Sequence, residues 1–202
     1  MNRLLYSLLA LTVFAVLLTG CSSSAHPRPA RSEPATIPSD SRATLKLPLI
    51  NSRIEVRKAE RKLLLFLDGR LVRTYHVGLG LSPVGDKERA GDHRTPEGDF
   101  YVFTKNAKSA FYLSLGVSYP NLAHAKRGLR DGLINQSQYN QIAAAIKQKK
   151  TPLQRTGLGG DIFIHGNGSR TDWTWGCVAL ENEEIKELFD AVEVGTPVTI
   201  KP

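Results

Sequence analysis

Apolar positions that alternate with polar ones, or run together, predict a series of short strands from residue 53 onward. Residues 54–56 alternate, whereas residues 63–67 are a continuous apolar run, which is typical of a strand buried on both faces. Asp68-Gly69 separates this run from residues 71–77 and predicts a two-residue hairpin turn, because both positions tolerate positive φ. Further strands are expected at 100–103, 112–119 and 162–164, and at 197–200 after a Gly195-Thr196 turn.

Helical periodicity occurs in two places. Residues 135–150 carry apolar side chains on one face, begin at an Asn135 or Ser137 N-cap, and stop before Pro152. We expect this helix to be an insertion between strands. A second helix is expected at 182–191, before the last strand. Many short strands with two segregated helices favour a mostly β domain of the α+β class.

The N-terminal residues have a different composition. An apolar run at 4–18 follows a basic start and is shorter than a membrane span, as in secretory signals. It ends in LTGC at 18–21, which resembles the lipobox of bacterial lipoproteins, where cleavage precedes a cysteine that is then acylated. An ordinary signal with a chance cysteine is the alternative. Residues 22–50 are rich in Ser, Pro, Ala and Arg and predict a disordered tether.

These features predict a lipoprotein signal peptide at 1–20, lipidated Cys21 with a tether up to residue 50, and a folded domain at 51–202. Ser22, where an Asp would retain a lipoprotein, implies a periplasmic protein anchored in the inner leaflet of the outer membrane. The 41% of apolar residues suffices for a core, and the net charge of +8 favours an anionic partner. Nucleic-acid binding is not expected of an exported chain with no concentrated basic run beyond 147–150.

The candidate chemistry depends on one cysteine and one histidine. The chain has two cysteines, and if Cys21 carries lipid, Cys177 has no disulfide partner in an oxidising compartment. His165 ends the apolar strand at 162–164 and lies twelve positions before Cys177, so that the two side chains can meet as base and thiol nucleophile. A buried, inert cysteine is the alternative.

Two motifs around these residues resemble a known family. The dipeptide His165-Gly166 and the run TWGCV at 174–178 resemble the HG and (S/T)xGC signature of L,D-transpeptidase catalytic domains, also called YkuD domains. The run TPEGDF at 95–100 is similar to that family's second motif, TPxGxF. The resemblance covers roughly residues 52–201 and is closest to the branch typified by YafK. It implies a β-sandwich-like catalytic domain with a helical insertion and a C-terminal helix and strand.

The resemblance also implies an activity, a cysteine acyl transfer on peptidoglycan stem peptides. In the family the cysteine attacks the carbonyl of meso-diaminopimelate, the terminal D-Ala leaves, and an amine from another stem or from a lipoprotein resolves the thioester. Some members instead hydrolyse such bonds and release wall-attached lipoprotein. A non-catalytic, lipid-anchored wall-binding tether is the third interpretation. Papain-like peptidases are disfavoured, because they place the cysteine before the histidine in the chain.

Roles can be assigned to the residues of the motifs. Cys177 is the expected nucleophile, and His165, as an imidazolium, is expected to lower its pKa and later to protonate the leaving amine. Backbone N–H groups of Gly176 and Cys177, with Trp175 as a further candidate, are expected to hold the oxyanion. A backbone carbonyl just after His165 orients its ring in the family. We expect Asn167 or Gly168 to supply it here, with Asp172 as the alternative.

Two departures from the family pattern bear on the substrate. Trp175 stands where the family often has His, and Ala179 stands where it often has Arg, so a substrate-orienting charge is missing. The expected substrate-binding residues are Arg94, Thr95, Arg170 and Trp173. Trp173 and Trp175 are expected to line the groove, with packing at its rim as the alternative. Arg94 and Arg170 are expected to hold substrate carboxylates, with a solvated position as the alternative. No cofactor or metal is expected, because His76, His93 and His124 lack paired ligand spacing. His93 lies near the Thr-Pro turn, where a surface position is the simpler interpretation.

Overall fold

The computed structural model describes residues 50–202; Cys21, the expected signal peptide and nearly all of the expected tether lie outside the described residues. No described helix is long and apolar enough to cross a membrane. The strands of the described part are β1 (Ser52–Arg57), β2 (Lys62–Leu67), β3 (Arg70–His76), β4 (Gly98–Ser109), β5 (Tyr112–Val117), β6 (Phe163–His165), β7 (Val178–Ala179) and β8 (Pro197–Lys201). Its helices are α1 (Leu122–Arg130), α2 (Gln136–Lys147) and α3 (Asn182–Ala191).

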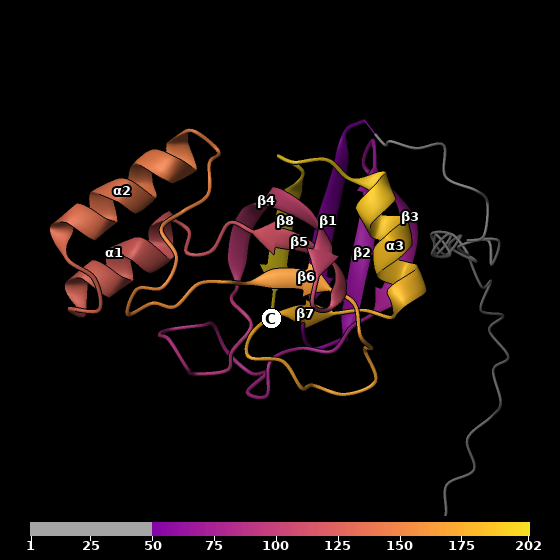
Figure 1. The fold of residues 1–202 in the computed structure, drawn as a ribbon, viewed down its shortest axis with the longest axis horizontal. Coiled ribbons are helices and arrows are strands. Elements are labelled where there is room, and N and C mark those ends of the chain that lie inside the picture. Colours follow the sequence, from indigo (N-terminus) through magenta and orange to yellow (C-terminus); the bar gives the residue numbers. More distant parts are fainter. Residues whose placement is uncertain (1–49) are drawn as a thin grey trace, which may run out of the picture. The chain divides into compact units, whose positions relative to one another are not determined.

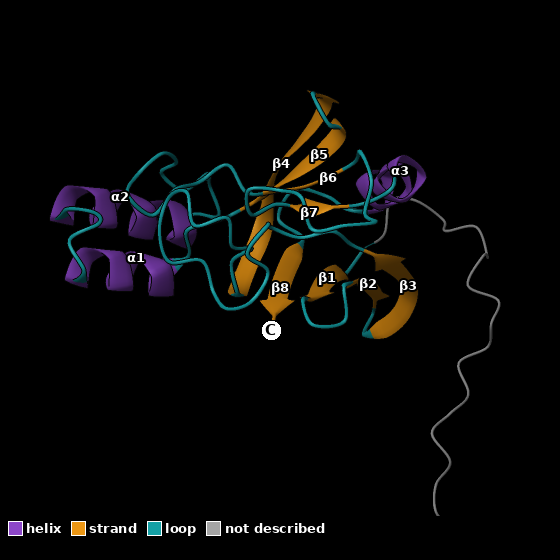
Figure 2. Cartoon of the chain, turned by 90° about the horizontal axis from the view of Figure 1, so that it is seen from below, coloured by secondary structure: helices purple, strands orange, loops and turns teal. Residues whose placement is uncertain are grey.

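The strands form one curled sheet in the order β3-β2-β1-β8-β4-β5-β6-β7 (Figures 1 and 2). Two neighbouring pairs, β1 with β8 and β6 with β7, are parallel, and the others are antiparallel. Strand β4 joins the two halves of the sheet, because its first residues pair with β8 and the rest pair with β5. Its register shifts between Val102 and Thr104, and such an irregularity bends a strand. The expected mostly β architecture is confirmed.

Local sequence signals explain several elements. Asp68 and Gly69 have φ values of 47° and 78°, so the predicted hairpin turn between β2 and β3 is confirmed. The predicted helix at 182–191 is confirmed as α3, which buries Ile185, Leu188 and Ala191 in the main core. That core draws residues from both halves of the sheet, which ties the two halves together.

The helical insertion between β5 and β6 contains two helices where one was expected. The predicted N-cap is confirmed, because Asn135 and Gln138 form a reciprocal capping box at the start of α2. Helix α1 was missed, although Asn121 is its N-cap and accepts hydrogen bonds from the backbone of Ala123 and His124. The two helices lie together at one end of the described domain (Figure 1). They share a small core with buried Ala125, Ile134, Ile142 and Leu158.

Candidate active site

Strands β6 and β7 bring the candidate nucleophile and base to one face of the sheet. Ile164 pairs with Val178 and His165 pairs with Ala179 in a parallel register. Ile164 and Val178 are completely buried in the main core. Because side chains alternate along strands, His165 and Cys177 project to the opposite face. The side chains of His165, at the end of β6, and of Cys177, directly before β7, therefore point to the same side of the sheet.

His165 and Cys177 line one cavity of about 420 Å³. Cys177 is partly exposed, and its Sγ accepts a hydrogen bond from the Phe163 N–H at 3.4 Å and donates to the Asp161 carbonyl at 3.6 Å. The remaining lining residues are Phe111, Trp173, Thr174 and Trp175. The cavity is therefore predominantly aromatic, with one thiol and one imidazole as its reactive groups.

The surroundings of this pair favour its neutral form. Burial raises the pKa of the Cys177 thiol to about 11, although the Phe163 N–H opposes this shift. Burial lowers the pKa of His165, and the hydrogen bond to Gly166 opposes this only in part. Both shifts favour the uncharged forms, so the resting structure does not support the expected imidazolium that lowers the thiol pKa. These directions favour His165 as a neutral base in the same cavity as a protonated thiol.

The orienting carbonyl of His165 belongs to the next residue in the chain. Nδ1 of His165 lies 2.7 Å from the carbonyl oxygen of Gly166, which only accepts, so Nδ1 carries the proton and Nε2 is the basic nitrogen. The expectation of Asn167 or Gly168 is wrong, because the Gly168 carbonyl accepts from Trp173 Nε1 at 3.0 Å. Asp172, the alternative, instead pairs with Arg61 and accepts from the Leu79 N–H.

Phe111 is a site residue that the sequence analysis missed. Its ring stacks on His165 with a centroid separation of 4.6 Å, and its carbonyl accepts from the Gly166 N–H at 3.1 Å. Trp173 contacts the same imidazole edge-on at 5.5 Å. Phe111 lies between β4 and β5, far from the motifs in sequence, so only the pairing of β5 with β6 brings it here.

The loop before Cys177 is shaped by Thr174 and Gly176. Thr174 Oγ1 donates to the Cys177 carbonyl at 2.8 Å and accepts from the Gly176 N–H at 3.2 Å. The Gly176 amide, one of the expected oxyanion donors, is therefore occupied at rest. No described residue accepts a hydrogen bond from the N–H of Trp175 or Cys177, which leaves these two amides available. Gly176 has φ +124°, and a Cβ there would meet the Arg94 carbonyl at 2.7 Å.

Thr95 packs against this loop from the interior of the domain. It is completely buried, its Oγ1 accepts from the Gly80 N–H at 3.0 Å, and it lies 3.4 Å from the Cys177 carbonyl. The expectation that Thr95 binds substrate is wrong, because a hydroxyl with no exposed surface does not reach a ligand. Its position instead ties the TPEG turn to the backbone of the nucleophile.

A partly buried ionic network holds the TPEG turn in place. Lys58 Nζ donates to Glu97 at 2.7 Å and to the Thr95 carbonyl at 3.0 Å. Asp86 accepts from the Glu97 N–H and faces His124 and Arg127 of α1, each at 3.0 Å. Although burial raises the pKa of Asp86, hydrogen bonds from His124 and from the Glu97 amide outweigh it and lower the value to about 2. The helical insertion is thereby joined to the turn beneath Cys177.

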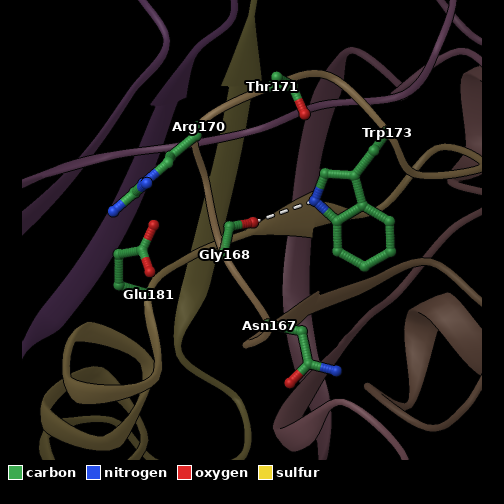
Figure 3. A pocket seen from close by; sticks show the side chains of 6 residues that line it. All are labelled: Asn167, Gly168, Arg170, Thr171, Trp173 and Glu181. Carbon is green, nitrogen blue, oxygen red and sulfur yellow. Dashed lines mark hydrogen bonds between the residues drawn. The ribbon is translucent and has the colours of Figure 1, made fainter.

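The other expected substrate-binding residues lie around the cavity. Trp173 lines it, and Trp175 is 77% exposed at its rim, where it stacks on His93 at 5.6 Å. Arg94 lies outside it, because its side chain pairs with Glu88 and lines a separate cavity. Arg170 lines an adjoining cavity together with Trp173 (Figure 3). The described residues contain no group of three or more metal-ligating side chains.

Comparisons with known proteins agree with this geometry. The model of the L,D-transpeptidase catalytic domain, YkuD, matches residues 51–200. No curated protein matches the chain significantly. Among solved structures, the chain is similar to Bd1075 of Bdellovibrio bacteriovorus, with 23% identity over 76% of this chain and 48% of that one, and a TM-score of 0.50.

Two further solved structures resemble the chain. The helical cell shape determining protein Pgp2 of Campylobacter jejuni has 24% identity over 74% of this chain and 47% of that one, with a TM-score of 0.49. An L,D-transpeptidase from Xylanimonas cellulosilytica has 20% identity over 79% of this chain and 64% of that one, with a TM-score of 0.44. The chain thus spans less than two thirds of each of these structures. Because the family model matches most of its length, this chain belongs to the L,D-transpeptidase catalytic domain family.

Proposed function

We propose that this chain is a peptidoglycan-modifying cysteine acyltransferase of the L,D-transpeptidase type, which acts on stem peptides at diaminopimelate through a thioester on Cys177. One observation carries the proposal: Cys177 and His165 line the same aromatic cavity on one face of the sheet. A thiol nucleophile and a base held in one cavity are the arrangement that covalent acyl transfer needs.

The proposed chemical steps start from a protonated Cys177 thiol and a neutral His165 imidazole. As Sγ of Cys177 forms a bond with the diaminopimelate carbonyl carbon, its proton moves to Nε2 of His165, and the carbonyl oxygen becomes an oxyanion. The free N–H groups of Trp175 and Cys177 are its proposed donors. Collapse breaks the bond to the terminal D-Ala, whose amine takes the proton from His165. An acceptor amine then attacks the thioester and releases the thiol.

Purified protein incubated with tetrapeptide muropeptides tests this proposal by mass spectrometry of the products. The expected result is cross-linked dimers with loss of D-Ala, and no product from the matched Cys177→Ala variant. Covalent carbapenem inhibitors should add one inhibitor mass to Cys177 in the wild-type chain. A wild-type protein that gives neither adduct nor product, beside a control enzyme that gives both, would sink the proposal.

Hydrolysis at the same site is the second candidate function, and Ala179 favours it. The position where the family often carries Arg is a completely buried, neutral side chain beside His165. Water would then replace the acceptor amine, as in an L,D-amidase or carboxypeptidase that releases wall-attached lipoprotein. Trimmed stems without dimers in the same experiment would identify this activity. If Cys177→Ala changed neither products nor cell-wall phenotype, a non-catalytic tether would remain.

The proposed location is the periplasm, with the chain anchored to the outer membrane through acylated Cys21. The lipobox-like run at 18–21 supports this proposal. Metabolic labelling with a palmitate analogue should mark the wild-type chain and not a Cys21→Ala variant. Equal labelling of both chains, or of neither, would contradict the anchor.

A further inference from the structure

A second cavity shares a wall with the cavity of Cys177. It encloses about 420 Å³ and is lined by Asn167, Gly168, Arg170, Thr171, Trp173 and Glu181. Trp173 lines both cavities, and the hydrogen bond from its Nε1 to the Gly168 carbonyl fixes the indole between them (Figure 3). The second cavity therefore adjoins the cavity of Cys177 across the indole of Trp173.

The ionisable side chains of this second cavity have opposite charges. Oε1 of Glu181 accepts from the N–H and from Oγ of Ser169, at 3.0 and 3.2 Å, and these bonds orient the carboxylate. The Ser169 backbone N–H and the nearby Arg170 cation hold the pKa of Glu181 below its usual range, so the carboxylate is ionised at neutral pH. Arg170 is exposed and forms no salt bridge within the described part of the chain. Figure 3 shows both side chains on the side of the cavity away from Trp173.

Resting on the proposed function, we propose that this cavity binds the amino and carboxylate groups at the side-chain end of the donor's diaminopimelate. Arg170 binds the carboxylate, and Glu181 binds the ammonium. The donor carbonyl must reach Sγ of Cys177, so the side chain of the same residue extends into a neighbouring space, and the second cavity supplies that space. Guanidinium groups bind carboxylates through two parallel N–H donors.

The proposal makes Arg170 the cation that selects the donor. Ala179 offers no charge beside His165, and Arg94 points into a different cavity, where it pairs with Glu88. A stem with lysine at the third position would bring an ammonium without a carboxylate. A stem with amidated diaminopimelate would bring a neutral carboxamide. Both of these stems should bind less well than a stem with unmodified diaminopimelate, because the guanidinium of Arg170 would lose the carboxylate that accepts its charge-assisted hydrogen bonds.

Kinetics on three synthetic tetrapeptide donors test the proposal, with diaminopimelate, amidated diaminopimelate or lysine at the third position. For the wild-type chain, kcat/KM should be about tenfold higher with the free carboxylate than with either analogue, mainly through KM. In Arg170→Gln this ratio should fall to about one, because the cation is gone. The matched control is Arg130→Gln, an exposed arginine of α1 that pairs with Asp131, which should keep the wild-type ratio.

A second variant tests the ammonium site. Glu181→Gln keeps an oxygen that can accept from Ser169 but loses the charge, so KM for the diaminopimelate donor should rise about tenfold. N-acetylation of the side-chain amine should remove the difference between this variant and wild type. If wild type and Arg170→Gln show the same donor preference, the second cavity does not select the donor. Carbapenem acylation of wild-type Cys177 would then support the proposed function of the thiol, while the proposed donor selection by the second cavity would be rejected.

Discussion

The cavity of Cys177 and the ionic network that holds the TPEG turn lie next to each other but differ in charge: the first favours uncharged groups, and the second consists of paired charges. The cavity is aromatic, and burial favours the uncharged forms of its thiol and its imidazole. The network buries Lys58 and His124 almost completely and pairs each with a carboxylate. Thr95 lies between the two regions, because its carbonyl accepts from Lys58 and its Oγ1 faces the Cys177 carbonyl.

This difference separates the supporting residues from the reacting ones. The paired charges fix the backbone around them. Any other backbone conformation would separate the pairs and leave a buried charge without a partner, which is strongly unfavourable. The reacting groups are kept neutral by burial, so the proton moves only when the thiol attacks. Substitutions in the two regions should therefore differ in what they change: rate in the cavity and stability in the network.

The largest effect on rate is expected for His165→Ala. Without the base, no side chain takes the thiol proton as Sγ attacks, and kcat/KM on muropeptides should fall about 10²–10⁴-fold. The melting temperature should fall too, because the buried imidazole packs on Phe111 and Trp173, so both rates are measured well below the melting temperature of each variant. His93→Ala is the matched control, because His93 stacks on Trp175 at the rim. Equal rate losses in the two variants would contradict the role of His165 as the base.

The largest effect on stability is expected for Lys58→Met. Glu97 and the carbonyls of Gly85 and Thr95 would lose a buried donor, which should lower the free energy of unfolding by about 3–5 kcal/mol. Denaturant titration measures the change. Lys62→Met, an exposed lysine paired with Glu60, should cost about 1 kcal/mol or less. Similar losses in both variants would show that burial of the network is unimportant.

Thr95→Val joins the two regions and should have an intermediate effect. It removes the acceptor of the buried Gly80 N–H and the hydroxyl near the Cys177 carbonyl, with a cost of about 1–3 kcal/mol in unfolding free energy. Because the loop of the nucleophile loses support, kcat should fall as well. Thr95→Ser, which keeps the hydroxyl, should restore both quantities. A variant with lowered stability and unchanged kcat would show that the loop does not depend on Thr95.

The last prediction concerns pH and not a substitution. The thiol pKa of about 11 means that Cys177 is neutral below that pH and becomes a thiolate only as pH rises towards it. Alkylation by iodoacetamide should be slow at pH 7 and rise steadily up to pH 10. Peptide mapping of the labelled site measures this rate. A plateau already reached by pH 8 would indicate an imidazolium-stabilised thiolate instead.

Much of the framework was accessible from local sequence patterns. The hairpin at Asp68-Gly69, the cap at Asn135 and the helix at 182–191 depend on residues close together in the chain, and each was predicted correctly. Helix α1 was missed because no element was expected between the strand at 112–119 and the helix at 135–150. The Asn121 cap was the signal that could have revealed it.

The sequence by itself determined the family of the domain and the two residues to examine, because motifs and strand-end positions are local features. Only the tertiary structure decided that the Gly166 carbonyl orients His165, that Phe111 covers the imidazole, and that Thr95 is buried. Burial, which shifts the pKa values of Cys177 and His165 towards their uncharged forms, also depends on the tertiary structure. The physical reason is that burial and hydrogen bonding between distant segments exist only once the sheet has curled and β5, β6 and β7 lie side by side.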